Sequence, residues 1–379
     1  MIRKTILALA LVLIAAWFGL NTFAQDRPAA DKPADKPADK PADKGTAEVA
    51  AAAKKFLAAL DDGQRGKAVF DFNDEAQRKR WSNLPSPMFQ RAGLRMGDLT
   101  PPQREAALAV LAAALSRQGY EKVSQIVEAD EMLRKGGGGG GGRGGPGGPG
   151  GPGGGRGGPG GGGGPAFGRD NYYIAFLGQP SATGPWMIQY GGHHLGLNVT
   201  FAGDHGTIAP SHTGAQPATY ELVGKTVRPL GREADKALAL LNALDDGQRK
   251  QAILGVQMRD LVLGPGRDGQ AMIQPEGVKG SALTDKQRDM LLDLAGEWTG
   301  ILHDAAGAAK MDEMKKTVGD TWFAWAGPTD KAGAAYFRIQ GPAVFIEYAP
   351  QRLGGDPTNH IHTIYRDPAN DYGAKWWKK

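Results

Sequence analysis

The spacing of apolar residues changes along this chain and predicts where helices and strands lie. Apolar residues recur at helical spacing from Val49 to Leu60 and again from Ala237 to Leu244, and Thr46 stands where an N-cap is expected for the first of these helices. Thr100 and Thr284 each precede a further apolar stretch and are predicted to cap two more helices.

Aromatic and β-branched residues alternate with a period of two in the segments that follow, which is typical of short β-strands. The predicted strands are 172–176, 186–190, 195–201, 322–325, 336–339, 344–348 and 360–365. Because helices precede strands in both parts of the chain, the predicted fold class is α+β, with a small antiparallel sheet in each part.

A sequence repeat predicts that these two parts are homologous halves. Leu60–Arg65 recurs unchanged as Leu244–Arg249, and the same offset relates Leu99–Arg104 to Leu283–Arg288, in which the Leu-Thr and Gln-Arg pairs are kept. We expect the halves to pack about a pseudo-two-fold axis. The predicted halves are residues 46–230 and 231–379.

Three segments are predicted to lie outside this core. Arg3 and Lys4, the apolar run 6–20 and the small residue Ala24 are together typical of a secretory signal peptide over residues 1–24. Asp-Lys-Pro-Ala repeats predict an extended linker over 25–45, and a glycine-rich tract predicts a disordered insert over 136–165. We expect a protein exported to the periplasm or the extracellular space, without stable membrane insertion after cleavage. The apolar run is short for a membrane span, and an uncleaved N-terminal anchor is the alternative.

The amino-acid composition limits which metal ligands and binding partners are expected. The sequence contains no cysteine, which excludes disulfides and thiolate ligands and leaves histidine, carboxylate and carbonyl oxygen for any metal site. A formal net charge of +5 over 379 residues gives no reason to expect a nucleic-acid partner. The expected partner is a small-molecule substrate or ligand.

Four histidines in two short stretches have the strongest claim to a site. His360 and His362 are two residues apart, so on a strand they leave the same face about 7 Å apart and can supply two metal ligands. His193 and His194 are adjacent and would face opposite sides of a strand; we expect His194 to join the other pair, with His193 as the alternative. Imidazole suits zinc, copper, iron or nickel. The alternative is a purely structural role, with hydrogen bonds to carbonyls and acids.

Three charged residues are candidates for catalytic roles. Glu347 lies among apolar residues of a predicted strand and is a candidate general base, although an ion pair with Arg338 would remove it from the site. Arg366 is a candidate clamp for an anionic substrate, and Asp367 a candidate partner that orients a histidine. Both also fit a simple turn.

The other histidines have weaker claims. His205 and His212 lie among Gly, Pro, Ser and Thr residues, which predicts a solvated loop; a lid or an extra metal ligand is the alternative. His303 lies beside Asp304 near a predicted helix end, where a cation would favour the helix dipole, so it is assigned a structural role.

Several motifs together resemble the uncharacterised DUF3500 family. The motifs are Gly178–Pro180, Gly192–Leu195, Gly214–Pro217, Tyr336–Pro342, His360–His362 and Tyr365–Pro368. The resemblance runs from about Phe56 to Gly373 and implies no established activity.

Two hypotheses for the function remain. Motifs for a nucleophilic serine, a phosphate-binding loop and a His-Glu-X-X-His zinc site are missing from the sequence. The first hypothesis is an exported metal-dependent hydrolase or oxidase, in which histidine-bound metal activates water or oxygen. The second is a non-catalytic protein that binds a small ligand or a polymer in a cleft lined by Trp186, Tyr190, Trp322 and Trp325.

Overall fold

The computed structural model describes residues 45–136, 165–352 and 355–377. All of these belong to one compact unit, Pro37–Lys379, and the other unit, Met1–Lys36, lies outside the described residues. The predicted signal peptide, linker and disordered insert fall almost wholly outside the described ranges. Within those ranges, no helix combines the length and the apolar content needed to cross a membrane.

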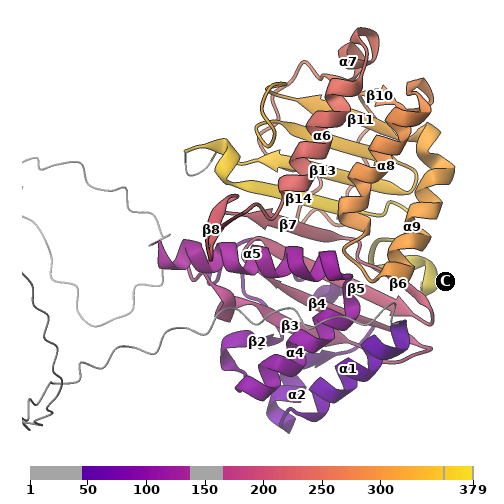
Figure 1. Ribbon diagram of the computed structural model, residues 1–379. Coiled ribbons are helices and arrows are strands. Elements are labelled where there is room, and N and C mark those ends of the chain that lie inside the picture. Colours follow the sequence, from indigo (N-terminus) through magenta and orange to yellow (C-terminus); the bar gives the residue numbers. More distant parts are fainter. Residues whose placement is uncertain (1–44, 137–164, 353–354, 378–379) are drawn as a thin grey trace, which may run out of the picture. The chain divides into compact units, whose positions relative to one another are not determined.

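One large sheet organises the described residues (Figure 1). Its strands are hydrogen-bonded in the order β1-β3-β4-β5-β7-β14-β13-β12-β11-β10, with β2 attached to β3 and β6 to β5. Neighbouring strands are antiparallel except for β1 and β3. The strands are β1 (Val69–Phe70), β2 (Leu94–Arg95), β3 (Tyr173–Leu177), β4 (Pro185–Gly192), β5 (Leu195–Ala202), β6 (His205–Thr207), β7 (Ser211–Ala215), β10 (Val278–Lys279), β11 (Trp322–Ala326), β12 (Tyr336–Gly341), β13 (Val344–Pro350) and β14 (Ile361–Arg366), beside a separate ribbon of β8 (Tyr220–Leu222) and β9 (Lys225–Val227).

Helices pack against this sheet, so the fold is mixed α and β, as predicted (Figure 1). The prediction of a separate small sheet in each half is wrong, because β7 and β14 are hydrogen-bonded and join the strands of both parts into one sheet. The α-helices are α1 (Thr46–Ala58), α2 (Asp62–Ala68), α3 (Glu75–Arg78), α4 (Pro101–Ala114), α5 (Arg117–Lys135), α6 (Gly231–Ala243), α7 (Asp246–Ala252), α8 (Asp285–Thr299) and α9 (Asp304–Thr317). Short 3₁₀ turns are η1 (Met96–Asp98), η2 (Arg169–Asn171), η3 (Gly280–Ala282), η4 (Val318–Asp320), η5 (Pro357–Asn359) and η6 (Asp371–Trp376).

The predicted helix starts are confirmed with one correction. Thr100 and Thr284 cap α4 and α8, and each forms a capping box with the glutamine three residues later. Thr46 is not the N-cap of α1; Gly45 holds that position, and the Thr46 hydroxyl donates to the carbonyl oxygen of Gly203 at 2.7 Å.

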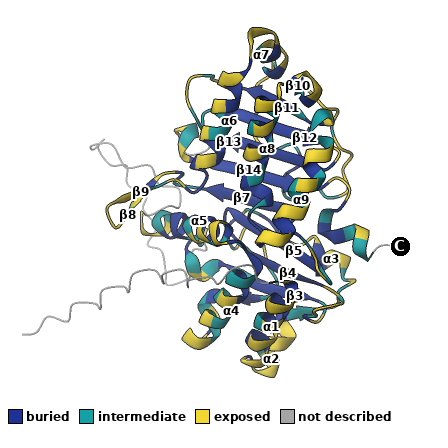
Figure 2. Ribbon diagram, turned by 45° about the vertical axis from the view of Figure 1, so that its right-hand side comes forward, coloured by how far each residue is buried: buried dark blue, intermediate teal, exposed yellow. Residues whose placement is uncertain are grey.

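The two faces of the central strands have different surroundings. On β14, Thr363 and Tyr365 point to the helices, where Thr363 accepts a hydrogen bond from Trp298 of α8 at 2.9 Å. Ile364 lies on the opposite face and packs in a second apolar cluster with Trp81 and Leu263. That second face is covered by residues 71–93, which include α3, and by the irregular segment 254–277. These supply Trp81, Leu261, Leu263 and Ile273 to the cluster, and the central strands are buried (Figure 2). His362 shares the face of Ile364, because side chains two residues apart point the same way.

Candidate metal centre

His193 and His194 form the turn between β4 and β5. The paired residues Gly191 and Gly196 lead into this turn, and Gly192 is needed there because a Cβ atom on it would come within 2.8 Å of the Tyr172 ring. His194 adopts the left-handed backbone conformation, with φ of 62°, which is strained for a residue other than glycine. The prediction that the two histidines sit on a strand and face opposite sides is therefore wrong. The turn instead holds both rings close together, with centroids 3.7 Å apart.

His362 is the second residue of β14 and His360 lies directly before that strand, and their rings point to the same side, as predicted. Their Nε2 atoms are 3.1 Å apart. The Nε2 atom of His194 lies 2.9 Å from that of His360. We call His194, His360 and His362 the histidine centre. All three side chains are buried, with exposed fractions of 2%, 7% and 8%.

The distances in the histidine centre fit coordination of one metal ion. Two ligands bound to one metal by bonds of about 2.0–2.1 Å stand about 2.8–3.4 Å apart when the angle between them is about 90–110°. The separations of 2.9 and 3.1 Å lie in that range. The three side chains also offer ligand atoms that all lie within 4.8 Å of one another. The expectation that His194 joins the His360–His362 pair is in agreement with this geometry.

The protonation of the centre also suits a metal. Burial, followed by the positive charge that neighbouring histidines would carry, lowers the pKa of His194 well below its usual value. The ring is therefore neutral at pH 7, which is the form that binds metals.

Asp260 and Asn83 flank His362. The Nδ1 atom of His362 lies 3.4 Å from Oδ1 of Asp260, and the side-chain amide of Asn83 lies 3.4 Å from its Nε2 atom. Burial would raise the pKa of Asp260, but hydrogen bonds from His362, Leu261 and Gln351 and the charge of His362 outweigh it and lower the pKa. An ionised carboxylate that accepts the Nδ1 proton leaves the Nε2 lone pair directed at the centre.

A contact between His193 and Asp130 of α5 supports the turn that holds His193 and His194. The Nδ1 atom of His193 lies 2.6 Å from Oδ1 of Asp130, and the other Asp130 oxygen accepts the Gly168 N–H at 2.8 Å. Asp130, His193 and His194 make up a second group with metal-ligand spacing. Asp130, Asp260 and Asn83 were not predicted, because nothing in their local sequence marks them; only their position in space does.

The other histidines lie in unexpected places. His212 is on the central strand β7, completely buried, with its ring centroid 5.2 Å from that of His362. The predicted solvated loop is thus wrong for His212, and neither of its ring nitrogens has a hydrogen-bond partner among the described residues. His205 is exposed on β6. His303 is the N-cap of α9, the end at which a cation is unfavourable, so the dipole argument for it is wrong.

The three predicted catalytic residues are not members of the two histidine groups. Glu347 accepts hydrogen bonds from the N–H groups of Val262 and Leu263, both at 2.9 Å, and from the Tyr336 hydroxyl at 2.7 Å. Arg338, which was considered as an ion-pair partner of Glu347, instead pairs with Glu276 at 2.9 Å.

Arg366 and Asp367 are also held by protein groups. Arg366 donates to the Leu263 carbonyl at 2.8 Å and pairs with Asp268 and Asp371 at 3.1 and 2.9 Å. Asp367 pairs with Lys310 of α9 at 2.6 Å. Neither residue is brought to the histidine centre in the role that the sequence suggested.

A cavity of about 150 Å³ opens beside the histidine centre. Its lining includes the buried His362, the half-buried Asn83 and the exposed Asp260 and Arg267. Arg267 makes no ion pair with another described residue. The cavity therefore joins a candidate metal centre to an available cationic side chain.

The fold and this site define a mixed α and β protein with a buried, histidine-rich candidate metal centre. The chain belongs to the family described as "Protein of unknown function (DUF3500)", whose model matches residues 42–374, as the resemblance implied. Neither a curated protein nor a solved structure matches the chain.

Proposed function

We propose that this protein binds one divalent transition metal through His194, His360 and His362. The observation that carries the proposal is the convergence of three buried Nε2 atoms, with separations of 2.9 and 3.1 Å. A neutral imidazole has a single N–H, and Asp260 is placed to accept that of His362 on the far side of the ring. In the tautomer with its proton on Nδ1, a histidine turns the Nε2 lone pair toward the centre, where a shared cation would bind it.

The function that we propose for this centre is hydrolysis of a small anionic substrate. A metal ion held by three histidines lowers the pKa of a bound water and polarises a carbonyl or phosphoryl oxygen. Asp260 fixes the tautomer and orientation of His362, and Asn83 offers an amide next to it. Arg267, rather than Arg366, is positioned to bind the substrate carboxylate or phosphate, because its guanidinium is not used by a protein carboxylate among the described residues.

Hydrolysis is preferred to oxidation because it needs no electron acceptor. The same ligands suit zinc, copper, iron or nickel, and bound iron or copper would favour the oxidase that we considered beside the hydrolase.

The site is proposed to form where two duplicated halves meet. Support comes from matching features in the two parts of the chain. Asp61 and Asp245 form equivalent capping boxes at the starts of α2 and α7. The side chains of Gln64 and Gln103 are hydrogen-bonded to each other, as are those of Gln248 and Gln287. A pseudo-two-fold axis between β7 and β14 would bring the turn His193–His194 of one half next to β14 of the other. We further propose export of the protein, on the signal-like pattern of residues 1–24.

The test is hydrolysis of p-nitrophenyl phosphate and p-nitrophenyl acetate by the zinc-loaded protein. We expect turnover that a chelator abolishes and zinc restores, with a higher KM for the phosphate in Arg267→Ala and little change in kcat. A zinc-loaded protein that hydrolyses neither ester would contradict the hydrolase and favour the non-catalytic binding protein.

A further inference from the structure

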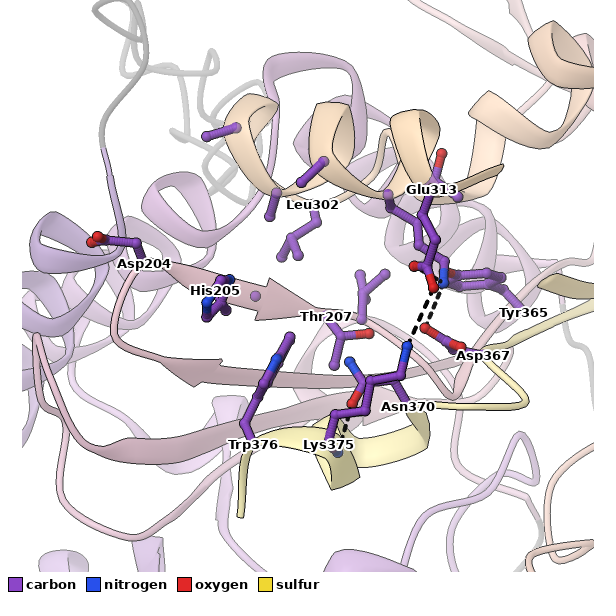
Figure 3. A pocket seen from close by; sticks show the side chains of 17 residues that line it. Asp204, His205, Thr207, Leu302, Glu313, Tyr365, Asp367, Asn370, Lys375 and Trp376 are labelled. Atoms are coloured by element: carbon purple, nitrogen blue, oxygen red, sulfur yellow. Dashed lines mark hydrogen bonds and ion pairs between the residues drawn. The ribbon is translucent and has the colours of Figure 1, made fainter. Parts of the chain in front are cut away.

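A second cavity, of about 240 Å³, lies between α9, β6 and η6 (Figure 3). None of the three residues of the histidine centre lines it. Small residues line much of it, namely Ala305, Ala306 and Ala309 of α9 and Gly206 of β6. We call it the α9 cavity.

One end of the α9 cavity is an aromatic wall. His205 and Trp376 stack there, with ring centroids 5.6 Å apart and planes inclined by 14° (Figure 3). Both residues line the cavity, and neither is fully buried: Trp376 is half-buried and His205 is exposed. A flat aromatic surface of this kind binds the C–H face of a sugar ring and leaves the hydroxyl groups at its edge free to hydrogen-bond.

The other end holds two lysines and two carboxylates whose charges are matched. Lys310 lies 2.6 Å from Asp367 and 2.9 Å from Glu313, and Lys375 lies 3.2 Å from Glu313. The side chains of Asp367 and Lys310 are only 3% and 13% exposed, so their positions are fixed before a ligand arrives. Because the charges cancel, this end does not select a free anion or cation. It does present ammonium donors beside carboxylate acceptors, and a hydroxyl group uses both.

The fifth charged side chain of the lining, Asp204, is exposed next to His205. From the aromatic wall, the matched charges at the other end and the size of the space, we propose that the α9 cavity binds a neutral, hydroxyl-rich ligand, a saccharide unit. This role is independent of the metal proposed for the histidine centre. It also gives Asp367 a position in a binding site, although a different one from that which its sequence predicted.

The test is saturation-transfer difference NMR on the full chain with methyl β-D-glucopyranoside and N-acetylglucosamine as probes. We expect transfer to the ring protons of at least one sugar, and at least tenfold weaker binding in Ala309→Phe, which fills the cavity and removes no polar group. Ala308→Phe is the matched control, because Ala308 is exposed on the same helix and does not line the cavity; it should bind as the unchanged protein does.

A second variant separates folding from binding. Trp376→Ala should also lose the signal, whereas Trp322→Ala, at a half-buried tryptophan on β11, should keep it. No transfer to either sugar, or transfer that Ala309→Phe and Trp376→Ala leave unchanged, overturns the proposal.

Discussion

Two groups of buried polar side chains lie on the same face of the central strands and differ in how their polar atoms are satisfied. Around Glu347 and Arg366, backbone N–H groups, a hydroxyl and two aspartates meet the charges at 2.7–3.1 Å. In the histidine centre, ring nitrogens face one another, and the neighbouring His212 has no partner among the described residues. A buried polar group without a partner is costly and needs an explanation. We therefore interpret the first group as one that stabilises the fold, and the histidine centre as the proposed metal site.

The largest expected effect is a loss of stability on substitution of Glu347, in the group that we interpret as structural. Glu347→Ala leaves two buried N–H groups and the Tyr336 hydroxyl without their acceptor, so we expect a loss of about 3 kcal/mol in the free energy of unfolding, measured with urea. Glu105→Ala, at an exposed position of α4, should stay within about 0.5 kcal/mol. If Glu347→Ala kept its stability but lost its metal, the division between the two groups would be wrong.

Metal should stabilise the folded protein through the histidine centre. With free zinc at about 100 times the dissociation constant, we expect the free energy of unfolding to rise by about 2.7 kcal/mol. The rise should disappear in His362→Ala and persist in His205→Ala, because His205 is exposed on β6. Equal stabilisation of both variants would place the zinc elsewhere.

Asp260 should tune the affinity without being a ligand itself. Asp260→Asn keeps the shape of the side chain and removes the charge next to Nδ1 of His362, so we expect zinc affinity to fall by about 10–100-fold. The comparison is a competition titration of zinc against a chromogenic chelator. An unchanged affinity would show that the contact of 3.4 Å does not support the centre.

The smallest expected effect, on stability and zinc affinity, comes from the packing of Gly214 of β7 against the histidine rings. A Cβ atom on Gly214 would come 2.8 Å from the Ile361 carbonyl oxygen and 3.2 Å from the rings of His194 and His212. Gly214→Ala should therefore shift these rings, cost about 1 kcal/mol in stability and weaken zinc binding. Gly296→Ala, in the open interior of α8, meets nothing within 4 Å and should gain about 0.5–1 kcal/mol because alanine favours the helix. Similar behaviour of the two variants would argue against tight packing at Gly214.

Much of this architecture can be read from local sequence, and the rest depends on contacts between distant segments. Period and capping residues located β3, β4, β5 and β11–β14 and the starts of α4 and α8, but not β7 or the shorter strands. The spacing of His360 and His362 was enough to place both rings on one side. His212 was mistaken for a loop residue because its neighbours are small and polar. The close packing between the neighbouring strands β7 and β14 requires a small residue at Gly214, which is paired with His362.

The residues that support the histidine centre could not be predicted from local sequence patterns. Asp130 sits in α5, and Asp260 and Asn83 sit in irregular segments with no periodicity; each reaches the site only through the folded chain. Glu347 was singled out because a carboxylate among apolar residues is unusual. The sequence contained no sign that the N–H groups of Val262 and Leu263 would satisfy it.

The proposed metal site is tested most directly by the metal content of the protein, purified without a histidine tag and measured by plasma mass spectrometry. The His360→Ala/His362→Ala double variant and the His205→Ala control are measured beside it. We expect about one equivalent of zinc, copper, iron or nickel in the unchanged protein and the control, and none in the double variant. No metal in any sample after reconstitution, or equal metal in all three, would contradict the assignment of the histidine centre.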